Sequence, residues 1–149
     1  MKMRTESDSM GQMEVPINAL YGASTQRAVL DFPISGIPMD RALIRAYGLI
    51  KLAAARVNSE LGLLSDEKRK FITLAAKEIY DGQHYEQFPV DVYQTGSGTS
   101  TNMNVNEVIA NRSNQISANT TKDGESNLCV HPNDDVNQSQ SSNDTFPTA

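Results

Sequence analysis

The chain has few of the residues that build covalent scaffolds or metal centres. Its 149 residues include one cysteine and no tryptophan, and aromatic residues make up only 6%. The single Cys129 excludes a disulfide within the chain, and two histidines, His84 and His131, are too few for a Cys/His zinc site. We therefore expect no metal and no cofactor. The scarcity of cysteine favours a reducing, cytoplasmic location.

Long apolar runs and basic clusters are missing as well. No apolar stretch approaches the roughly 18 residues that a membrane-spanning helix needs, and the opening MKMRTESDSMGQ lacks the apolar core of a secretory signal. The net charge is −5, and basic residues nowhere form a cluster. The sequence therefore predicts neither a membrane nor a nucleic-acid partner. A small anionic substrate is not excluded, because local groups decide its binding.

What is present is a helical pattern. Between residues 40 and 61, apolar residues recur at steps of three and four, which places them on one face of a helix. Asp40 is suited to cap its start and Gly62 to end it. Charged residues such as Lys51 fall off this stripe, so we expect them in solvent. The apolar positions are Leu43, Tyr47, Ile50, Ala54, Val57 and Leu61.

Other segments also favour a mainly α fold. A second helix is predicted from about 65 to 80, and its short connection to the first implies an antiparallel helical hairpin. A third helix is predicted from about 98 to 117. The remaining expectations are an extended arm at 1–16, a short helix within 17–31, a loop at 32–38, a loop with at most two short extended pieces at 83–96, and an exposed, turn-rich stretch at 118–129.

Residues 95–107, TGSGTSTNMNVNE, form the first of two polar segments. Gly96 and Gly98 flank Ser97, and a helix is predicted to begin directly afterwards. In such a turn, backbone N–H groups and the hydroxyls of Ser97 and Thr99 can converge on one anion, favoured by the helix dipole. The pattern matches neither a P-loop nor a complete dinucleotide-binding motif. An anion site and an ordinary capped helix start both remain open.

Residues 130–149, VHPNDDVNQSQSSNDTFPTA, form the second polar segment. Residues 141–144 are predicted to lead from a loop into a helix, where hydroxyls and an amide can also bind a carboxylate. His131 beside Asp134 is either a group that holds or transfers a proton or an ordinary surface histidine. Ten of the twelve asparagines lie between positions 102 and 143, interleaved with apolar residues at helical spacing. This favours a folded site over a disordered tail.

Together the two segments resemble the N-terminal part of the class II fumarases, in the aspartase/fumarase superfamily. The matching stretches are QTGSGTSTNMNVNEVIANR and VHPNDDVNQSQSSNDTFPTA. Similarity at EVPINALYGASTQRAVLDFPIS, ALIRAYGLIKLAAARVN and GQHYEQFPVDVYQTG extends the resemblance over essentially the whole chain. The related aspartate ammonia-lyases typically have GGAGTS where this chain has TGSGTS, and Asn in place of His131. Both differences favour fumarase.

The resemblance implies an N-terminal domain at residues 1–140 and the beginning of a central helical-bundle domain at 141–149. It implies a homotetrameric lyase of the tricarboxylic acid cycle that adds water reversibly to fumarate and gives L-malate. The hard step is removal of a weakly acidic C–H proton beside a carboxylate, and preorganised donors must hold the resulting dianion. The residues that match the family's substrate loops are Ser97, Gly98, Thr99, Ser141, Ser142 and Asn143.

A secondary dicarboxylate site, separate from the reacting centre, is also implied. Family members often have an arginine just before it, where this chain has Asn127-Leu128-Cys129. The residues that match the secondary site are His131, Pro132, Asn133 and Asp134.

The family's Thr-His pair and its mobile serine-bearing loop lie well beyond position 149. The acid and base of the reaction are therefore unknown from this sequence, and we expect residues 1–149 alone to be inactive. Two alternatives stay open. One is an aspartate ammonia-lyase-like parent enzyme, and the other is a noncatalytic domain that binds a dicarboxylate or a partner.

Overall fold

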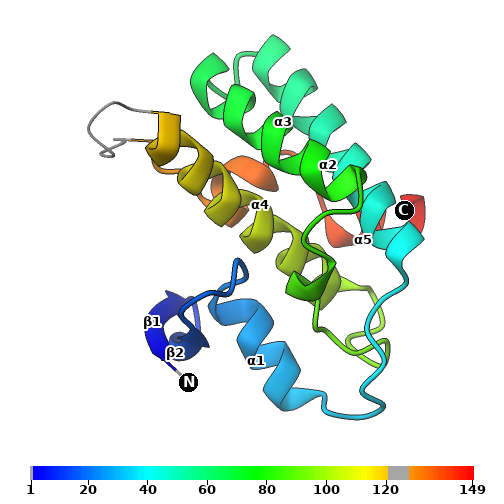
Figure 1. Cartoon of the computed structure of the whole chain (residues 1–149). Coiled ribbons are helices and arrows are strands. Elements are labelled where there is room, and N and C mark those ends of the chain that lie inside the picture. The colour runs from blue at the N-terminus through cyan, green and yellow to red at the C-terminus, as the bar shows by residue number, and fades with distance from the viewer. Residues whose placement is uncertain (1, 121–127) are drawn as a thin grey trace.

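The computed structural model describes residues 2–120 and 128–149 and is mainly helical, as predicted. Two paired strands come first, and the three long helices α2, α3 and α4 pack together (Figure 1). The elements are β1 (Met3–Asp8), β2 (Gly11–Pro16), α1 (Ala23–Asp31), α2 (Arg41–Glu60), α3 (Asp66–Tyr80), the 3₁₀ helix η1 (Tyr85–Gln87), α4 (Thr99–Thr120), the π-helical turn η2 (Pro132–Val136) and α5 (Ser142–Thr148).

The N-terminal arm is extended, as predicted, and its two strands pair as an antiparallel hairpin with Asp8 opposite Gly11. The Asp8 carboxylate accepts a hydrogen bond from Met10 N at 2.9 Å, and Gly11 has a φ of +118°, which only glycine adopts easily. Arg27 of α1 binds Asp8 at 2.9 Å and so holds the turn of the hairpin against α1. Polar side chains dominate both strands, which is why no alternating apolar pattern predicted the pairing.

Helices α2 and α3 form the predicted antiparallel hairpin. The Asp40 side chain accepts a hydrogen bond from the first turn of α2 at 2.7 Å, and Ser65 caps α3. Gly62, with a φ of +72°, ends α2 in the left-handed conformation. The helices approach closely at Gly48, where an added Cβ atom would lie 2.6 Å from Tyr80 N.

The buried face of α2 differs from the predicted one. Lys51 is fully buried, although its place off the apolar stripe predicts a solvated charge, whereas Val57 and Leu61 are 52% and 66% exposed. The prediction was wrong for these residues because the buried face of α2 combines apolar residues with Lys51 and Asn58, and the C-terminal part of the apolar stripe is left exposed. The buried residues of α2 are Ile44, Tyr47, Gly48, Lys51, Ala55 and Asn58.

The segments predicted as loops at 32–38 and 83–96 meet at Asp91. This carboxylate is buried, and Asp91 also forms an isolated bridge with Pro38. Its hydrogen bonds join the two segments, because the donors come from both. The donors to Asp91 are the N–H groups of Ser35, Gly36 and Tyr93 and the hydroxyl of Ser35.

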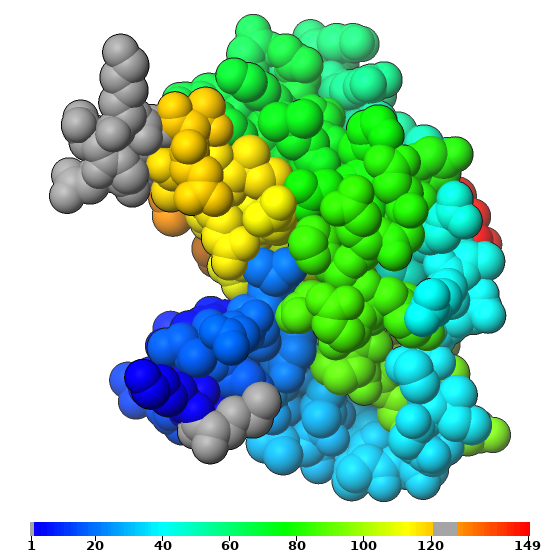
Figure 2. Space-filling model, viewed as in Figure 1, coloured from blue at the N-terminus to red at the C-terminus, as the bar shows by residue number. Residues whose placement is uncertain are grey.

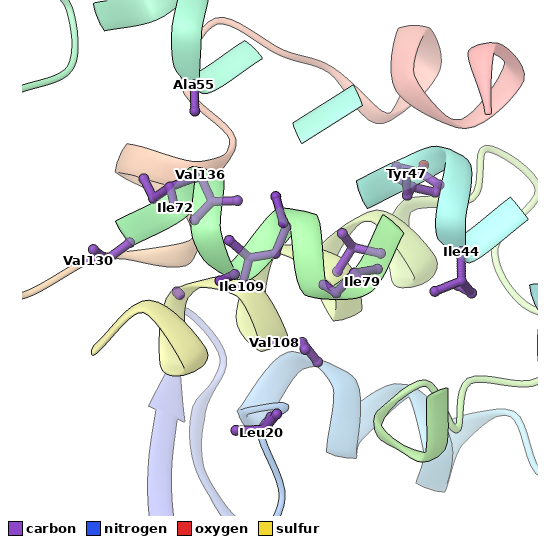
Figure 3. Close-up of a cluster of buried hydrophobic side chains, with 14 of the residues drawn as sticks. Leu20, Ile44, Tyr47, Ala55, Ile72, Ile79, Val108, Ile109, Val130 and Val136 are labelled. Carbon is purple, nitrogen blue, oxygen red and sulfur yellow. The ribbon is translucent and has the colours of Figure 1, made fainter. Parts of the chain in front are cut away.

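Helix α4 occupies the centre of the fold and continues to Thr120, beyond its predicted end. Residues 121–127 of the predicted turn-rich stretch lie outside the described residues. The apolar core forms where α2, α3 and α4 meet residues 128–136 (Figure 3). Its members include Ile44, Tyr47, Ile72, Ile79, Val108, Ile109, Val130 and Val136.

In the space-filling view, strands β1 and β2 lie at one end of the visible face and the α2–α3 hairpin lies at the other (Figure 2). In the described part of the chain, the helices are too short or too polar to cross a bilayer.

Candidate functional site

The first polar segment forms a tight turn directly before α4. Gly98 N donates to Thr95 O at 3.0 Å, and Gly98 has a φ of +71°. A Cβ atom on Gly98 would collide with the Phe146 ring, so a residue without a side chain is needed twice over, for backbone conformation and for space. The turn therefore packs directly against α5.

Three hydroxyls from the two polar segments meet at the start of α4. Thr99 Oγ1 lies 2.9 Å from Ser97 Oγ and 3.0 Å from Ser142 Oγ. We call these three residues the hydroxyl cluster. Ser97 and Thr99 are exposed and Ser142 is half-buried, so the cluster is open to solvent. Two segments far apart in sequence thus form one set of donors beside a helix N-terminus, whose dipole favours an anion.

The other members of the predicted substrate loops adjoin the hydroxyl cluster. Ser141 is the N-cap of α5 and accepts a hydrogen bond from Asn143 N at 3.2 Å. Asn143 is exposed in the first turn of that helix, and Gly98 supplies the buried backbone of the turn before α4. The structure therefore brings the predicted residues of both loops together on adjoining segments.

Gln94 holds the turn onto α4, and sequence reasoning missed it. Its amide accepts a hydrogen bond from Thr101 N at 2.9 Å and donates to Thr101 Oγ1 at 2.5 Å. The same amide donates to Asp91 O at 3.3 Å. No spacing rule links residues seven apart across a loop, so the sequence carries no signal for this role.

The two polar segments also meet in a buried polar network around Lys51. Its Nζ donates to Asn102 Oδ1 at 2.8 Å, to Gln140 Oε1 at 2.9 Å and to Asn137 Oδ1 at 3.1 Å. Burial lowers the pKa of Lys51 to about 7, whereas the three amide oxygens favour the charged form. Sequence reasoning missed this residue. The available signal was its place four residues after Tyr47 on the same helix face.

Glu107 organises a different side of α4. Its buried carboxylate accepts hydrogen bonds from Gly22 N at 2.9 Å, Ser24 N at 2.8 Å, Thr25 N at 3.0 Å and Thr25 Oγ1 at 2.6 Å. Helix α1 has no capping side chain of its own, so Glu107 satisfies its first N–H groups. This role is structural, and the sequence did not reveal it because the partners lie more than eighty residues apart.

His131, the first residue of the predicted secondary site, caps the turn η2. Its Nδ1 accepts a hydrogen bond from Asp134 N at 3.1 Å, so in the neutral ring the proton sits on Nε2. His131 N donates to Asp135 Oδ2 at 2.8 Å, and Asp135 pairs with Lys68 at 2.7 Å. Of the two neighbouring carboxylates, Asp135 is therefore committed to Lys68 and Asp134 is exposed.

A pocket of about 460 Å³ lies between η2 and the turn of the N-terminal hairpin. Its lining includes His131, Pro132 and Asn133 together with the carboxylates of Asp8 and Glu107, and no lysine or arginine contributes among the described residues. The hydroxyl cluster is not part of this lining. The pocket therefore contains three of the four predicted secondary residues, without Asp134, and the acidic residues in its lining make it a poor place for a dianion.

Among residues 2–120 and 128–149, His, Cys, Asp and Glu side chains nowhere gather in a group of three that is placed to hold a metal ion.

Comparison with known proteins identifies the family. A sequence profile described as lyase matches residues 11–149. The chain belongs to this lyase family. Two curated relatives of this chain are class II fumarate hydratases: one from Mycobacterium tuberculosis (strain H37Rv) is 61% identical and one from Halobacterium salinarum is 56% identical, each over 98% of this chain.

A solved structure of a family member supports the same assignment. The crystal structure of recombinant class II fumarase from Schistosoma mansoni matches 98% of this chain with a TM-score of 0.90 and 41% identity. The predicted fold, the N-terminal region of the fumarase fold, is thereby confirmed. The chain spans about 30% of the length of these relatives, with 29% and 30% of the curated sequences and 30% of the solved chain covered.

Proposed function

We propose that residues 1–149 are the N-terminal, substrate-loop-bearing part of a fumarate hydratase, which catalyses reversible hydration of fumarate to L-malate. The observation that carries this proposal is the hydroxyl cluster, formed by Ser97, Thr99 and Ser142 in a chain 61% identical to a class II fumarate hydratase. The relatives are fumarate hydratases, which favours this reaction over the elimination of ammonia from aspartate.

The chemistry of the cluster suits a dicarboxylate. Hydroxyl groups and first-turn N–H groups donate hydrogen bonds, and they are too weakly acidic to lose their protons to a carboxylate substrate. Because the Gly98 turn packs on Phe146 and Gln94 holds it to α4, these donors are fixed before substrate binds. Preorganised donors of this kind stabilise the dianion that forms when the C–H proton leaves. The acid and base come from a part of the enzyme outside residues 1–149.

The remaining expectations are part of the proposal. Residues 1–140 form the N-terminal domain, and residues 141–149, which include α5, begin a central helical domain. His131, Pro132, Asn133 and Asp134 form a secondary dicarboxylate site. The enzyme acts as a cytoplasmic homotetramer in the tricarboxylic acid cycle. Apolar residues exposed on one stretch support burial against another subunit, namely Leu30, Ile34 and Ile37.

The test of the reaction is an assay of the complete enzyme that contains these residues, with fumarate, L-malate and L-aspartate in parallel. Interconversion of fumarate and L-malate supports the proposal. Exclusive turnover of L-aspartate would make the chain part of an ammonia-lyase. Binding of a dicarboxylate without turnover would indicate a noncatalytic domain. Residues 1–149 alone are expected to be inactive, and malate dehydration by this piece would contradict the assignment of the acid and base elsewhere.

The role of the cluster is tested by Thr99→Val in the complete enzyme. The change keeps the shape of the side chain and removes the hydroxyl, so we expect kcat/KM for fumarate to fall about 100-fold. Thr73→Val is the matched control, because the Thr73 hydroxyl bonds only the backbone of its own helix. Equal kcat/KM in both variants would exclude a role for Thr99 in binding or catalysis.

A further inference from the structure

Lys51 is a fully buried lysine whose described partners are all neutral. Its ammonium group donates three hydrogen bonds, one each to the side-chain amide oxygens of Asn102, Asn137 and Gln140. An ammonium has three donors and no acceptor, so this geometry satisfies the charged form completely. Hydrogen bonds to neutral amides do not cancel the charge, however. The positive charge therefore remains uncompensated inside the protein.

The charged groups on the elements that pack around Lys51 are engaged elsewhere or exposed. On η2, Asp135 pairs with Lys68 and Asp134 is exposed, while on α4 the Glu107 carboxylate binds the start of α1. On α5, Asp144 is exposed, and on α2 the titratable neighbour is Tyr47, whose phenol pKa is raised by burial. Among the described residues no carboxylate lies within ion-pair distance of Lys51. This is unusual for a buried lysine, which is normally paired.

The three acceptors belong to the two segments that build the hydroxyl cluster. Asn102 lies one helical turn after Thr99 on α4, and Gln140 immediately precedes the cap of α5. The two segments are also tied to each other, because Thr145 Oγ1 of α5 lies 3.2 Å from Asn102 Oδ1. Lys51 thus contacts the Thr99 segment through Asn102 and the Ser142 segment through Gln140, and its charge is buried whereas Ser97 and Thr99 are exposed.

We propose that Lys51 is a positioning residue, which aligns the two hydroxyl-bearing segments through Asn102 and Gln140 and supplies the fixed positive charge that favours a dicarboxylate dianion at their surface. The inference rests on the proposed function of the hydroxyl cluster. Hydroxyls and amides orient a dianion without balancing its charge, and among the described residues no lysine or arginine contacts the cluster. A charge buried at low dielectric acts over several ångströms with little screening.

A second consequence distinguishes this role from simple packing. Because burial lowers the pKa of Lys51 to about 7, part of the lysine is neutral near neutral pH. A dianion bound in front of it favours the ammonium, so binding takes up a proton at this residue. The dissociation constant for a dicarboxylate should therefore rise as the pH increases above about 7. A residue that only fills space would give no such dependence.

The experiment uses the complete enzyme and succinate, an unreactive dicarboxylate dianion, in calorimetric titrations. Wild-type enzyme is titrated at pH values of about 6, 7 and 8 in buffers of different ionisation enthalpy, which gives the dissociation constant and the protons taken up. We expect proton uptake that is greatest near pH 7 and above. Lys51→Met keeps the apolar stem and removes the charge, so we expect binding about tenfold weaker at pH 6, with the uptake reduced.

Lys51→Arg keeps the charge but stays protonated throughout this range, so the uptake should fall even if its different shape weakens binding. This variant keeps the proposal testable if Lys51→Met does not fold. Lys77→Met is the matched control, because Lys77 is exposed and pairs with Asp81. The His131→Asn variant, which alters the proposed secondary site, should retain the uptake assigned to Lys51.

Wild-type binding without proton uptake, or uptake unchanged in both folded Lys51 variants, would overturn the inference. That result would leave the proposed function intact if the enzyme still interconverts fumarate and L-malate. Absence of turnover in the wild-type enzyme would instead count against the proposed function.

Discussion

The α2–α3 hairpin and the surroundings of α4 are held together by different interactions. The hairpin interface is made of apolar and small residues, with Gly48 against the backbone of α3 and Ala75 and Ala76 fully buried. Around α4, buried polar groups dominate, and Glu107, Asp91 and Lys51 each collect three or more hydrogen bonds. We call these three residues the polar hubs.

Apolar packing in the hairpin and buried hydrogen bonds around α4 contribute to the fold in different ways. Apolar contact is not directional, so the hairpin contributes stability without fixing a loop to within a fraction of an ångström. Each polar hub has directional bonds to a segment distant in sequence, and a misplaced segment would leave buried donors unsatisfied. Lys51 therefore fixes the two segments of the hydroxyl cluster, while Glu107 fixes the start of α1 and Asp91 joins residues 32–38 to 83–96. The predictions below test this division, beginning with the largest expected effect on stability.

Glu107→Ala removes the acceptor of four donors at the start of α1. We expect a loss of about 3–5 kcal/mol in the free energy of unfolding, because buried N–H groups are left without partners. Urea denaturation measures this loss, and amide exchange should show it concentrated in α1. Glu107→Gln, which keeps one oxygen, should lose less, and Glu60→Ala on the surface should change little. A loss of exchange protection spread evenly over α2 and α3 would contradict the distinction between the apolar hairpin and the polar hubs.

Gly48→Ala tests the apolar side of the comparison. The added Cβ would meet Tyr80 N at 2.6 Å and Ala76 O at 2.9 Å, and helix backbone cannot move aside cheaply. Overpacking of this kind typically destabilises by about 1–3 kcal/mol, against a gain of about 1 kcal/mol in helix propensity. We expect a net loss of up to about 2 kcal/mol in urea denaturation. Gly96→Ala is the control, since its Cβ would meet open space. Equal stability of the two variants would contradict a close helix contact.

How far the sequence predicts each region follows from the same division. The hairpin depends on local signals, and Asp40 and Gly62 lie where the cap and the stop of α2 were predicted. The predicted buried face of α2 was wrong, because the apolar stripe does not reveal that Lys51 donates hydrogen bonds to three amide oxygens. These acceptors lie 51, 86 and 89 residues away in the sequence. Helical spacing carries no information on contacts so distant.

The candidate site was predicted from resemblance rather than from spacing. The residues alone left an anion site and an ordinary helix start open at Thr99, and nothing in the pattern joined it to Ser142. The contact between them depends on Gly98 accommodating Phe146, which is a property of the packed structure. Gln94 and Glu107 were missed for the same reason, since both act through partners chosen by the fold.

The hub at Asp91 should be sensitive to acid. Burial opposes its charged form, but three backbone N–H groups and the Ser35 hydroxyl outweigh burial and lower the pKa of Asp91 to about 2. Because the folded pKa lies below the unfolded value of about 3.9, these bonds stabilise fully above pH 3.9, and the contribution is lost as the pH falls toward 2. We expect the amides of Ser35, Gly36 and Tyr93 to lose exchange protection over this interval while those of α3 keep it.

Asp91→Asn is the matched control for the acid effect, because its amide cannot titrate. In that variant protection of the same amides should be lower at neutral pH and independent of pH between about 2 and 4. Parallel loss of protection in α3 and at Asp91 in the wild-type protein would mean that acid unfolds the whole chain together, and that the hub is not a separate unit.

The smallest effect is expected at the helix caps of the hairpin. Asp40 accepts its hydrogen bond at 2.7 Å and Ser65 at 3.3 Å, so Asp40→Ala should lower the free energy of unfolding by about 1 kcal/mol and Ser65→Ala by less. Neither cap contacts a polar hub or the hydroxyl cluster. Urea denaturation should therefore detect the change while kcat/KM for fumarate in the complete enzyme stays at the wild-type value. A fall in kcat/KM with Asp40→Ala would show that the hairpin transmits its position to the loops, and the stability of α2 would then belong to the site as well.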